Sequence, residues 1–552
     1  MNTLLKKVFP TLLLAGLSPA CKTTCLPPGP LHADIVKELD NPSIWKDPIL
    51  ASTPIIDVHV HTFNARYLPL RGVIEGKRDA GPPVTWLISD RCSAVIAADL
   101  CSRTVLAPYG GHSFARSMEM STNGKGDFSI ACAVFSSLIN KGIQKGVWTS
   151  GMSSKAQLAA LDKMAEEDLN LSERLAVRAT GRMMGMEEHM DNADQMDGVK
   201  TILRYLWTLT QSDASLIDLY RNLHEGTQHA GDIKIVSHMM DLAPVYNQKP
   251  DGVNLIDFEK EQIPRTRAFT QQHTQGATYF VAYNPYRDYW NGGKPGDALR
   301  IVKEAVLKKG ASGVKVYPPS GYRPAPAPAG SEPLAKFPSE RPTPFFTRFP
   351  GKQWDARYGP LGKDADEKLY AELDALLSWC ETNRVPVFTH CGHGELEARK
   401  GYGLAHANPV FWRGALQRHP DLRLCLGHAG GGDFWYGCGK LSSWGREVFE
   451  LCATYPNVYC EVTSGTEVLD KHRRAYFVEK VSGLIAESQD KSKFAHDFSK
   501  KLLYGTDWPQ PDAGDPKAVL QGVQLCFLHP KLHCYYADYF HRNAEAYLGR
   551  KL

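Results

Sequence analysis

The sequence predicts an α/β protein, a (β/α)8 TIM barrel with a large helical insertion after strand one and a proline-rich loop after strand four. Short apolar runs recur along the chain, and several are apolar throughout, as in parallel strands that are buried on both faces. Helical patterns lie between many of these runs, and eight such units favour a closed barrel over an open sheet. The predicted strands are Ile55–Val60, Ile233–Val236, Ala277–Ala282, Gly313–Val316, Val385–Thr389, Leu422–Leu426, Val458–Val462 and Leu502–Tyr504.

Two insertions interrupt this repeat. Residues 64–231 separate the first two strands, which is far more chain than one crossover needs, and we predict a helical cap there. Residues 318–363 follow strand four and are rich in proline, which disfavours helix and sheet, so we predict a long loop on the active-site face. Helices are predicted at Ala156–Asp168, Val199–Arg221, Ala298–Lys309, Asp364–Thr382 and Phe411–Gln417.

The start of the chain has the pattern of a secretory signal. Lys6 and Lys7 precede the apolar run Val8–Leu17, and small residues follow up to Ala20. We therefore predict a signal peptide over residues 1–20, an N-terminal tail over 21–54 and the barrel over 55–552, with export to the periplasm. The stretch before Cys21 resembles a bacterial lipoprotein processing site, so Cys21 as a lipid anchor and ordinary cleavage after Ala20 are both open.

Charge and motifs exclude several classes of function. The formal net charge is +4, from 64 basic and 60 acidic residues. A charge this small gives no strong positive field that would attract nucleic acid. The sequence contains no glycine-rich dinucleotide or phosphate loop after a strand and no Gly-x-Ser-x-Gly elbow. A small-molecule substrate is expected instead, and a homodimer is left open.

Polar residues end four of the predicted strands. His59 and His61 lie two apart on strand one, where a period of two places both on the same face. His390, His428 and Asp507 end the strands at 385–389, 422–426 and 502–504. The carboxyl ends of barrel strands meet in one place, and imidazoles with a carboxylate are ligands for a divalent transition metal. The sequence therefore predicts a metal-dependent active site at this end of the barrel.

From about Ile55 to its end, the sequence resembles the amidohydrolase superfamily. More narrowly, it is similar to the amidohydrolase-related branch that includes the aminocarboxymuconate semialdehyde decarboxylase group. The motifs that carry the resemblance are Asp57–His61, Thr389–Cys391, Gly427–Gly431 and Tyr504–Pro509.

The resemblance implies a role for each of these side chains. His59, His61 and His390 would ligate one divalent metal, and Asp507 would ligate it or lie beside it, with a further catalytic role. His428 would be the catalytic acid or base. Zinc is the default metal, and manganese, iron or cobalt also suit three histidines and an aspartate.

Other residues near the strand ends are candidates for substrate binding. Lys315, on strand four, is open to three interpretations: a contact to a substrate anion, carboxylation to bridge two metals, or a structural ion pair. Asp241, Arg287 and Arg323 follow strands two, three and four, where the arginines could bind a substrate carboxylate and Asp241 could point into the site, and a salt bridge is the alternative for each. Glu461, on strand seven, is a candidate for orienting a ligand.

Three functions are compatible with these residues. The first is a metal-dependent hydrolase that cleaves an amide, ester or lactone bond with an activated water molecule. The second is a metal-dependent decarboxylase or hydratase of a small carboxylate. The third is an exported binding protein that keeps the barrel without catalysis.

Overall fold

The computed structural model describes residues 30–62, 154–170, 195–208, 213–225, 232–242, 258–272, 276–290, 297–326, 365–392, 402–437, 442–462, 465–510 and 515–552, together with short pieces between 135 and 227. Eight parallel strands form one sheet whose spatial order is the chain order from β1 to β8. The strands are β1 (Ile56–Val60), β2 (Lys234–His238), β3 (Ala277–Tyr283), β4 (Gly313–Val316), β5 (Val387–His390), β6 (Leu424–Gly427), β7 (Val458–Glu461) and β8 (Leu502–Leu503). All eight predicted strands are confirmed.

The sheet closes on itself between β8 and β1. Val58 N donates to Tyr504 O over 3.0 Å, Asp507 N to His59 O over 2.7 Å, and His61 N to Trp508 O over 2.7 Å. These bonds run along strand one and the segment after β8, so the last strand is paired with the first. The predicted (β/α)8 barrel is confirmed.

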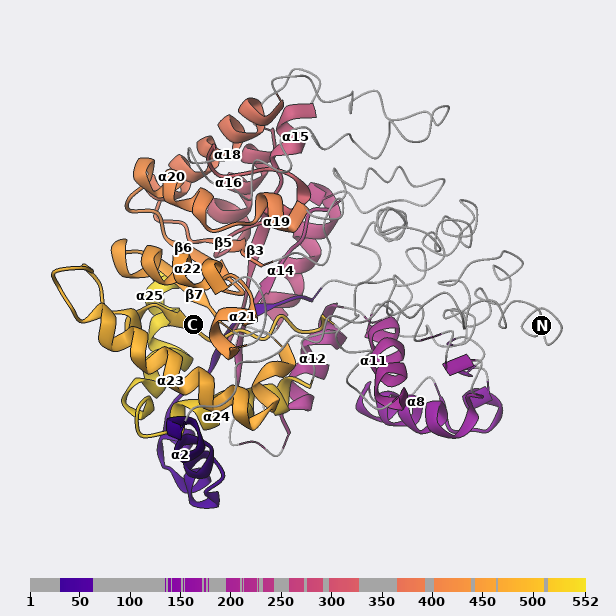
Figure 1. The fold of residues 1–552 in the computed structure, drawn as a ribbon. Helices are drawn as coiled ribbons and strands as arrows, with labels where there is room; N and C mark the ends of the chain where they lie inside the picture. Colours follow the sequence, from indigo (N-terminus) through magenta and orange to yellow (C-terminus); the bar gives the residue numbers. More distant parts are fainter. Residues whose placement is uncertain are drawn as a thin grey trace, which may run out of the picture.

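Helices follow the strands and surround the barrel (Figure 1). Three of the predicted helices are confirmed, at Asp297–Lys309 (α16), Ala365–Thr382 (α18) and Val410–Arg418 (α20). The long helices of the barrel are α14 (Ile263–Gln272), α16 (Asp297–Lys309), α18 (Ala365–Thr382), α20 (Val410–Arg418), α22 (Ser442–Thr454), α23 (Lys471–Ser488) and α24 (Pro516–Leu528). Shorter helical segments are η5 (Phe258–Gln262), α15 (Pro285–Trp290), η6 (Pro318–Ser320), α19 (Tyr402–His406), α21 (Gly432–Tyr436), η8 (Gly465–Leu469), η9 (Phe498–Lys500), η11 (His533–Tyr535), η12 (Asp538–Arg542) and α25 (Asn543–Leu548).

Local signals set the ends of several of these helices. The Asp470 side chain accepts hydrogen bonds from His472 N and Arg473 N at the start of α23. Asp515 caps α24 in the same way, and Pro516 follows at the first helical position. Helix α25 ends at Gly549, whose φ of 68° is the left-handed conformation that glycine adopts without strain.

The barrel interior is filled and closed at the amino-terminal ends of the strands. Side chains from seven strands form one apolar cluster, and residues of α25 pack into it. Side chains from so many strands can meet only in the interior of the barrel. The cluster consists of Ile56, Val58, Val236, Phe280, Phe388, Cys425, Tyr459, Leu503, Ala544, Tyr547 and Leu548. Because α25 covers this end, the carboxyl ends of the strands are left for a site.

The described part of the insertion after β1 is helical, as predicted. It includes α8 (Ser154–Asp168), α11 (Gln195–Thr208) and α12 (Asp213–Leu223). Helix α12 lies between α24 of the barrel and the pair α8–α11 (Figure 1), and it contacts α14 and α24. The single helix predicted over 199–221 is wrong, because α11 ends at Thr208 and α12 begins at Asp213. The intervening sequence contains Thr and Ser, whose hydroxyl groups compete for backbone hydrogen bonds.

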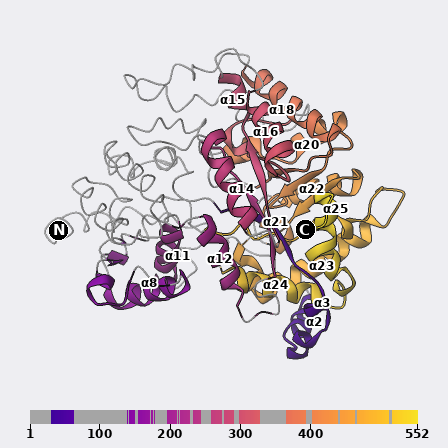
Figure 2. The same cartoon turned by 180° about the vertical axis from the view of Figure 1, so that it is seen from behind.

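The segment before β1 also packs on the barrel. Residues 30–54, predicted as part of a tail, contain α2 (Pro30–Leu39), η1 (Pro42–Lys46) and α3 (Ile49–Ser52). Helix α2 packs against α23, which Figure 2 shows from behind. Among the helices that the structure describes, none combines the length and the apolar character needed to span a membrane.

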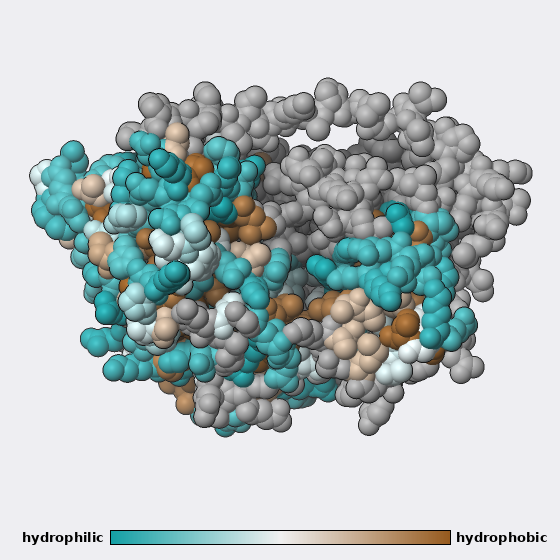
Figure 3. Space-filling view, turned by 90° about the horizontal axis from the view of Figure 1, so that it is seen from below, coloured by the Kyte–Doolittle hydropathy of each residue, from teal (hydrophilic) through white to brown (hydrophobic). Residues whose placement is uncertain are grey.

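Large exposed apolar side chains are scattered rather than gathered. In the view of Figure 3, hydrophilic residues dominate the described surface of both the barrel and the inserted helices. The exposed examples are Trp45, Val147, Leu307, Leu404 and Leu469, which lie on different elements. Among the described residues we therefore find no apolar patch of the size expected of a protein interface.

Candidate metal centre

The closure of the barrel brings the histidines of strand one against the aspartate that follows strand eight. Asp507 Oδ1 lies 3.2 Å from His59 Nε2 and 3.0 Å from His61 Nε2. All three residues are paired through the backbone bonds between β1 and the segment after β8. Three residues that were predicted to meet therefore do so.

The other ring nitrogen of each histidine is held by an acceptor. His61 Nδ1 lies 3.0 Å from the carbonyl oxygen of His238, so Nδ1 carries the proton and Nε2 has the lone pair. His59 Nδ1 lies 3.1 Å from Glu461 Oε2. This is the arrangement that fixes the tautomer and the ring orientation of metal-binding histidines.

The residues present fit a divalent cation. One ligand atom each from His59, His61 and Asp507 lies within 4.8 Å of the others. Asp507 Oδ1 is buried and accepts no hydrogen bond, although it lies beside two imidazole nitrogens. Two imidazole nitrogens and one carboxylate oxygen that lie this close together are the donor set of a zinc or manganese site.

His390 and His428 lie next to this group rather than within it. Their ring centroids are 4.6 Å apart, and His428 Nε2 lies 3.8 Å from Asp507 Oδ2. His428 forms a second group of candidate ligand atoms with His59 and Glu461. His390, predicted as the third histidine ligand, belongs to neither group, so the structure places it one ring away from His59.

The backbone at His428 is in a conformation that L-residues rarely adopt. Its φ is 66°, and Ala429 follows with a φ of 45°. His428 N donates to Glu461 Oε2 over 3.1 Å, which is the same oxygen that binds His59 Nδ1. Left-handed conformations of this kind cost about 1 kcal/mol or more and cluster at functional sites. Glu461, predicted as a candidate for orienting a ligand, thus contacts the candidate ligand His59. It also accepts a hydrogen bond from the backbone of His428, the candidate acid or base.

Glycine is required at Gly430 in the turn that follows. A Cβ there would lie 2.8 Å from the Trp444 carbonyl carbon and 2.9 Å from Gly445 N, and its φ is 86°. The backbone of this turn therefore packs directly against α22, which fixes the place of His428.

Burial dominates the protonation of the site. It lowers the pKa of His59 well below its ordinary value, and the charge of Lys315 adds to this, so His59 is neutral. Burial raises the pKa of Asp507, but the close contact with His61 and the charges of His428, His61 and Lys315 outweigh it and hold that pKa below its ordinary value. The site thus presents a neutral imidazole and a carboxylate, the forms that bind a metal.

Lys315 extends from β4 into the same group. Its Nζ lies 3.1 Å from His59 Nε2 and 4.3 Å from the centre of the Phe388 ring. Its side chain makes no ion pair with any residue that the structure describes. Burial lowers the pKa of Lys315 to about 8, against the charges of Asp507 and Glu461, which raise it. The structural ion pair considered for Lys315 is therefore not formed within the described residues.

Asp57 is a buried carboxylate whose role sequence reasoning missed. It accepts hydrogen bonds from His59 N, Thr506 N, Thr506 Oγ1 and the hydroxyl of Tyr220. Burial raises the pKa of Asp57 to about 6, and these hydrogen bonds oppose the rise. An aspartate inside an otherwise apolar strand was the available signal, because a buried carboxylate needs partners.

Two of the residues predicted to bind substrate bind each other. Arg287 donates to both carboxylate oxygens of Asp241, over 2.5 and 2.8 Å. The Arg323 guanidinium lies 5.0 Å from the centre of the Phe411 ring on α20. The alternative considered for Arg287 and Asp241, a salt bridge, is thus present.

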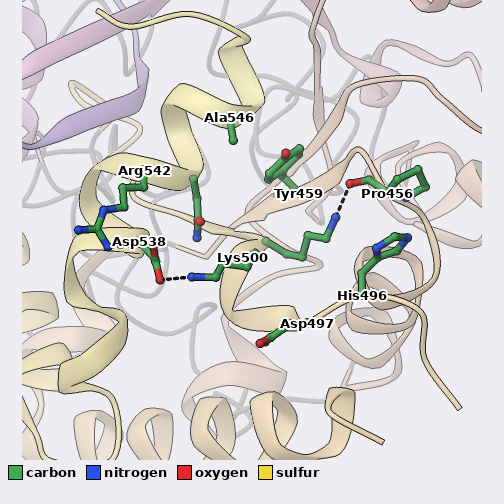
Figure 4. A pocket seen from close by; sticks show the side chains of 10 residues that line it. Pro456, Tyr459, His496, Asp497, Lys500, Asp538, Arg542 and Ala546 are labelled. Atoms are coloured by element: carbon green, nitrogen blue, oxygen red, sulfur yellow. Dashed lines mark hydrogen bonds and ion pairs between the residues drawn. The ribbon is translucent and has the colours of Figure 1, made fainter. Parts of the chain in front are cut away.

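A cavity of about 370 Å3 lies at the other end of the barrel (Figure 4). Its lining includes Tyr459 at the start of β7 and Lys501 just before β8. Lys501 Nζ donates to the carbonyl oxygens of Tyr455 and Pro456, and Lys500 pairs with Asp538 over 2.5 Å. Charged groups at this end of a barrel serve stability, whereas catalytic groups lie at the carboxyl ends of the strands.

The C-terminal part of the chain is similar to a known family. Residues 289–550 match the family model described as amidohydrolase. A search of curated proteins found no match to the chain. The matched region contains β4 to β8 and therefore Lys315, His390, His428, Glu461 and Asp507, whereas β1 lies outside it.

Several solved structures are similar to this chain at low sequence identity. One, from Lactobacillus casei and provisionally described as a metal-dependent hydrolase, is 12% identical over 91% of this chain and 96% of that chain, with a TM-score of 0.38. The 5-carboxyvanillate decarboxylase of Sphingomonas paucimobilis is 13% identical over 68% of this chain and 95% of that chain, with a TM-score of 0.35. That of Novosphingobium aromaticivorans, solved with manganese, is 11% identical over 68% and 91%, with a TM-score of 0.35.

The similarity to the amidohydrolase family covers residues 289–550, and the strand order of this chain shows the barrel. The His59–His61–Asp507 group lies at the carboxyl ends of the barrel strands, where barrel enzymes keep their catalytic groups. Over residues 289–550, just under half of its length, the chain is similar to the amidohydrolase family.

Proposed function

We propose that the protein is a metal-dependent hydrolase that cleaves an amide, ester or lactone bond of a small organic substrate. The contacts of Asp507 carry this proposal. Its Oδ1 lies beside the Nε2 atoms of His59 and His61, and its Oδ2 lies 3.8 Å from His428 Nε2. One carboxylate therefore joins the candidate ligands to a second group that can transfer a proton.

His59, His61 and Asp507 would hold the metal, and zinc is the metal we propose. When bound, a divalent metal supplies a Lewis acid that polarises a carbonyl oxygen and favours loss of a proton from water. The low pKa of Asp507 keeps its carboxylate available as a proton acceptor. Asp507 Oδ2 would take the proton of the attacking water and deliver it to the leaving group. His428 would polarise the scissile bond or share this proton.

A second candidate function is decarboxylation or hydration of a small carboxylate. The observation that favours it is Lys315, a buried ammonium group 3.1 Å from His59 Nε2 that makes no ion pair among the described residues. A substrate carboxylate at this position would supply the missing negative charge. In that case Lys315 would bind substrate rather than carry a carboxylated side chain.

Activity assays on the zinc-loaded and manganese-loaded protein separate these functions. We would measure acid release from panels of aryl esters, lactones and anilides, and carbon dioxide release from aromatic carboxylates. The hydrolase proposal predicts acid release that falls by a factor of about 100 or more in Asp507→Asn. Asp490→Asn, at an exposed aspartate, is the matched control and should retain the wild-type rate.

Each outcome selects one function. Carbon dioxide release without acid release would replace the hydrolase by the decarboxylase. A folded, metal-loaded protein that turns over no substrate of either panel would favour the exported binding protein.

Export and assembly remain predictions. Residues 1–20 and Cys21 lie outside the described residues, so both the periplasmic form and the lipid-anchored form stay proposals. Radiolabelled fatty acid incorporated by the wild type and not by Cys21→Ala would establish the anchor. Light scattering on the purified protein would test the homodimer.

A further inference from the structure

Helix α12 of the insertion reaches into the support of the candidate metal centre. The hydroxyl group of Tyr220 donates to Asp57 Oδ2 over 2.5 Å, and both side chains are fully buried. Tyr220 and Asp57 are 163 residues apart in the sequence, and the family match begins only at residue 289. This contact is therefore a contribution of the insertion to the barrel.

Asp57 holds both halves of the candidate site. One of its oxygens accepts from His59 N over 3.0 Å and from Thr506 N over 3.1 Å, and the other accepts from Thr506 Oγ1 over 2.7 Å. Thr506 directly precedes Asp507, whose φ of 56° is left-handed and whose N–H donates to His59 O. The position of Asp507 relative to His59 thus depends on how the Asp57 carboxylate is oriented.

Tyr220 is itself held firmly in place. Its ring lies 5.3 Å from the Trp508 ring and 4.8 Å from the His224 ring, measured between centroids. The end of α12 is joined to the barrel by Lys517 Nζ of α24, which donates to Glu225 O over 2.7 Å. The ring is therefore fixed in an orientation in which its hydroxyl group donates to Asp57 Oδ2.

We propose that Tyr220 is a positioning residue of the metal centre, which acts through Asp57 to fix the distance between Asp507 and the His59–His61 pair. The inserted segment is then part of the active-site support and not only a cover. This inference rests on the proposed function, because it requires His59, His61 and Asp507 to bind a metal. Groups behind metal ligands typically change metal affinity 10- to 100-fold when removed.

The test compares Tyr220→Phe with Tyr283→Phe in the full chain. Tyr283 is also buried and also donates to an aspartate, Asp288 Oδ2 over 3.2 Å, but this pair lies on β3 and α15 away from the ligands. We would measure the cobalt(II) dissociation constant by competition with a chromophoric chelator, together with the visible absorption of the bound ion. Tyr220→Phe is expected to weaken cobalt binding about tenfold or more and to alter the absorption bands. Tyr283→Phe is expected to lose stability while it keeps the wild-type affinity and spectrum.

The outcomes separate this inference from the proposed function. Wild-type protein that binds no cobalt would overturn the metal-dependent function and this inference with it. Wild-type affinity and spectrum in Tyr220→Phe would overturn the inference alone. If Tyr220→Phe is poorly folded, it can be measured with Gly483→Ala, since a Cβ at this position in α23 meets no atom within 4 Å and alanine favours the helix. An equal loss of affinity in Tyr283→Phe would show general destabilisation and would also overturn it.

Discussion

Gly505 lies where any side chain would press on the ligand support, so Gly505→Ala is a direct perturbation of the site. A Cβ at residue 505 would lie 2.7 Å from Glu461 Cγ and 2.8 Å from His59 Cβ. Carbon atoms in contact prefer about 3.5–4.0 Å, so one or both neighbours must move by roughly 0.7 Å. Both neighbours are fully buried, and overpacking of this kind costs about 1–3 kcal/mol of unfolding free energy.

The displacement matters more for metal binding than for stability. Functional groups must be held within about 0.5 Å of their working positions, and a shift of roughly 0.7 Å in His59 or Glu461 would exceed this. We expect Gly505→Ala to fold, to unfold at lower urea concentration, and to bind zinc at least about tenfold more weakly. Urea denaturation followed by circular dichroism and zinc titration calorimetry measure the two effects.

Gly522→Ala is the matched control for the stability loss. A Cβ at Gly522 would lie 2.8 Å from Val468 O, but this contact is between α24 and η8. The control should lose stability without loss of zinc affinity. Gly505→Ala protein with wild-type zinc affinity would refute the reasoning, because the ligand His59 would then tolerate the added methyl group.

Two further predictions concern charge. Burial raises the pKa of Glu461 to about 8 from an ordinary 4.5, so this group contributes stability that is fully present below about pH 4.5 and is lost as the pH rises through 8. The melting temperature of metal-free protein should therefore fall from pH 5 to pH 9 more steeply than that of Glu461→Gln, and parallel curves would contradict this. Arg287→Ala should lower the unfolding free energy by about 1–3 kcal/mol, since it leaves the buried carboxylate of Asp241 without its bidentate partner. Urea denaturation measures this loss, and a substrate role for Arg287 would instead appear as a raised KM at unchanged stability.

Most of the barrel could be predicted because its signals are local. Buried parallel strands are short apolar runs, and a polar residue at the end of such a run stands out. His59, His61 and Asp507 follow this pattern. They are far apart in the sequence, but the closed barrel places the first strand beside the last and so brings them together. The strand-end histidine His428 also lies beside Asp507, as expected.

The support of the site was harder to predict because it depends on tertiary contacts. Tyr220 gives no local signal, since a tyrosine on an amphipathic helix most often packs in a core. His390 ends its strand like the others, yet its ring lies beside His428 and outside the ligand groups. This depends on the direction of its side chain, which the sequence does not give. Arg287 and Asp241 lie at neighbouring strand ends, and the sequence alone does not distinguish their mutual ion pair from two separate substrate contacts.

The central claim is that His59, His61 and Asp507 form a metal centre, and metal content tests it most directly. We would determine bound zinc, manganese, iron and cobalt per chain by elemental analysis of purified wild type and His61→Ala, with circular dichroism to confirm folding. The account predicts about one divalent metal per chain in the wild type and little or none in the variant. Folded wild-type protein that contains no divalent metal and takes none up from zinc or manganese buffers would contradict it.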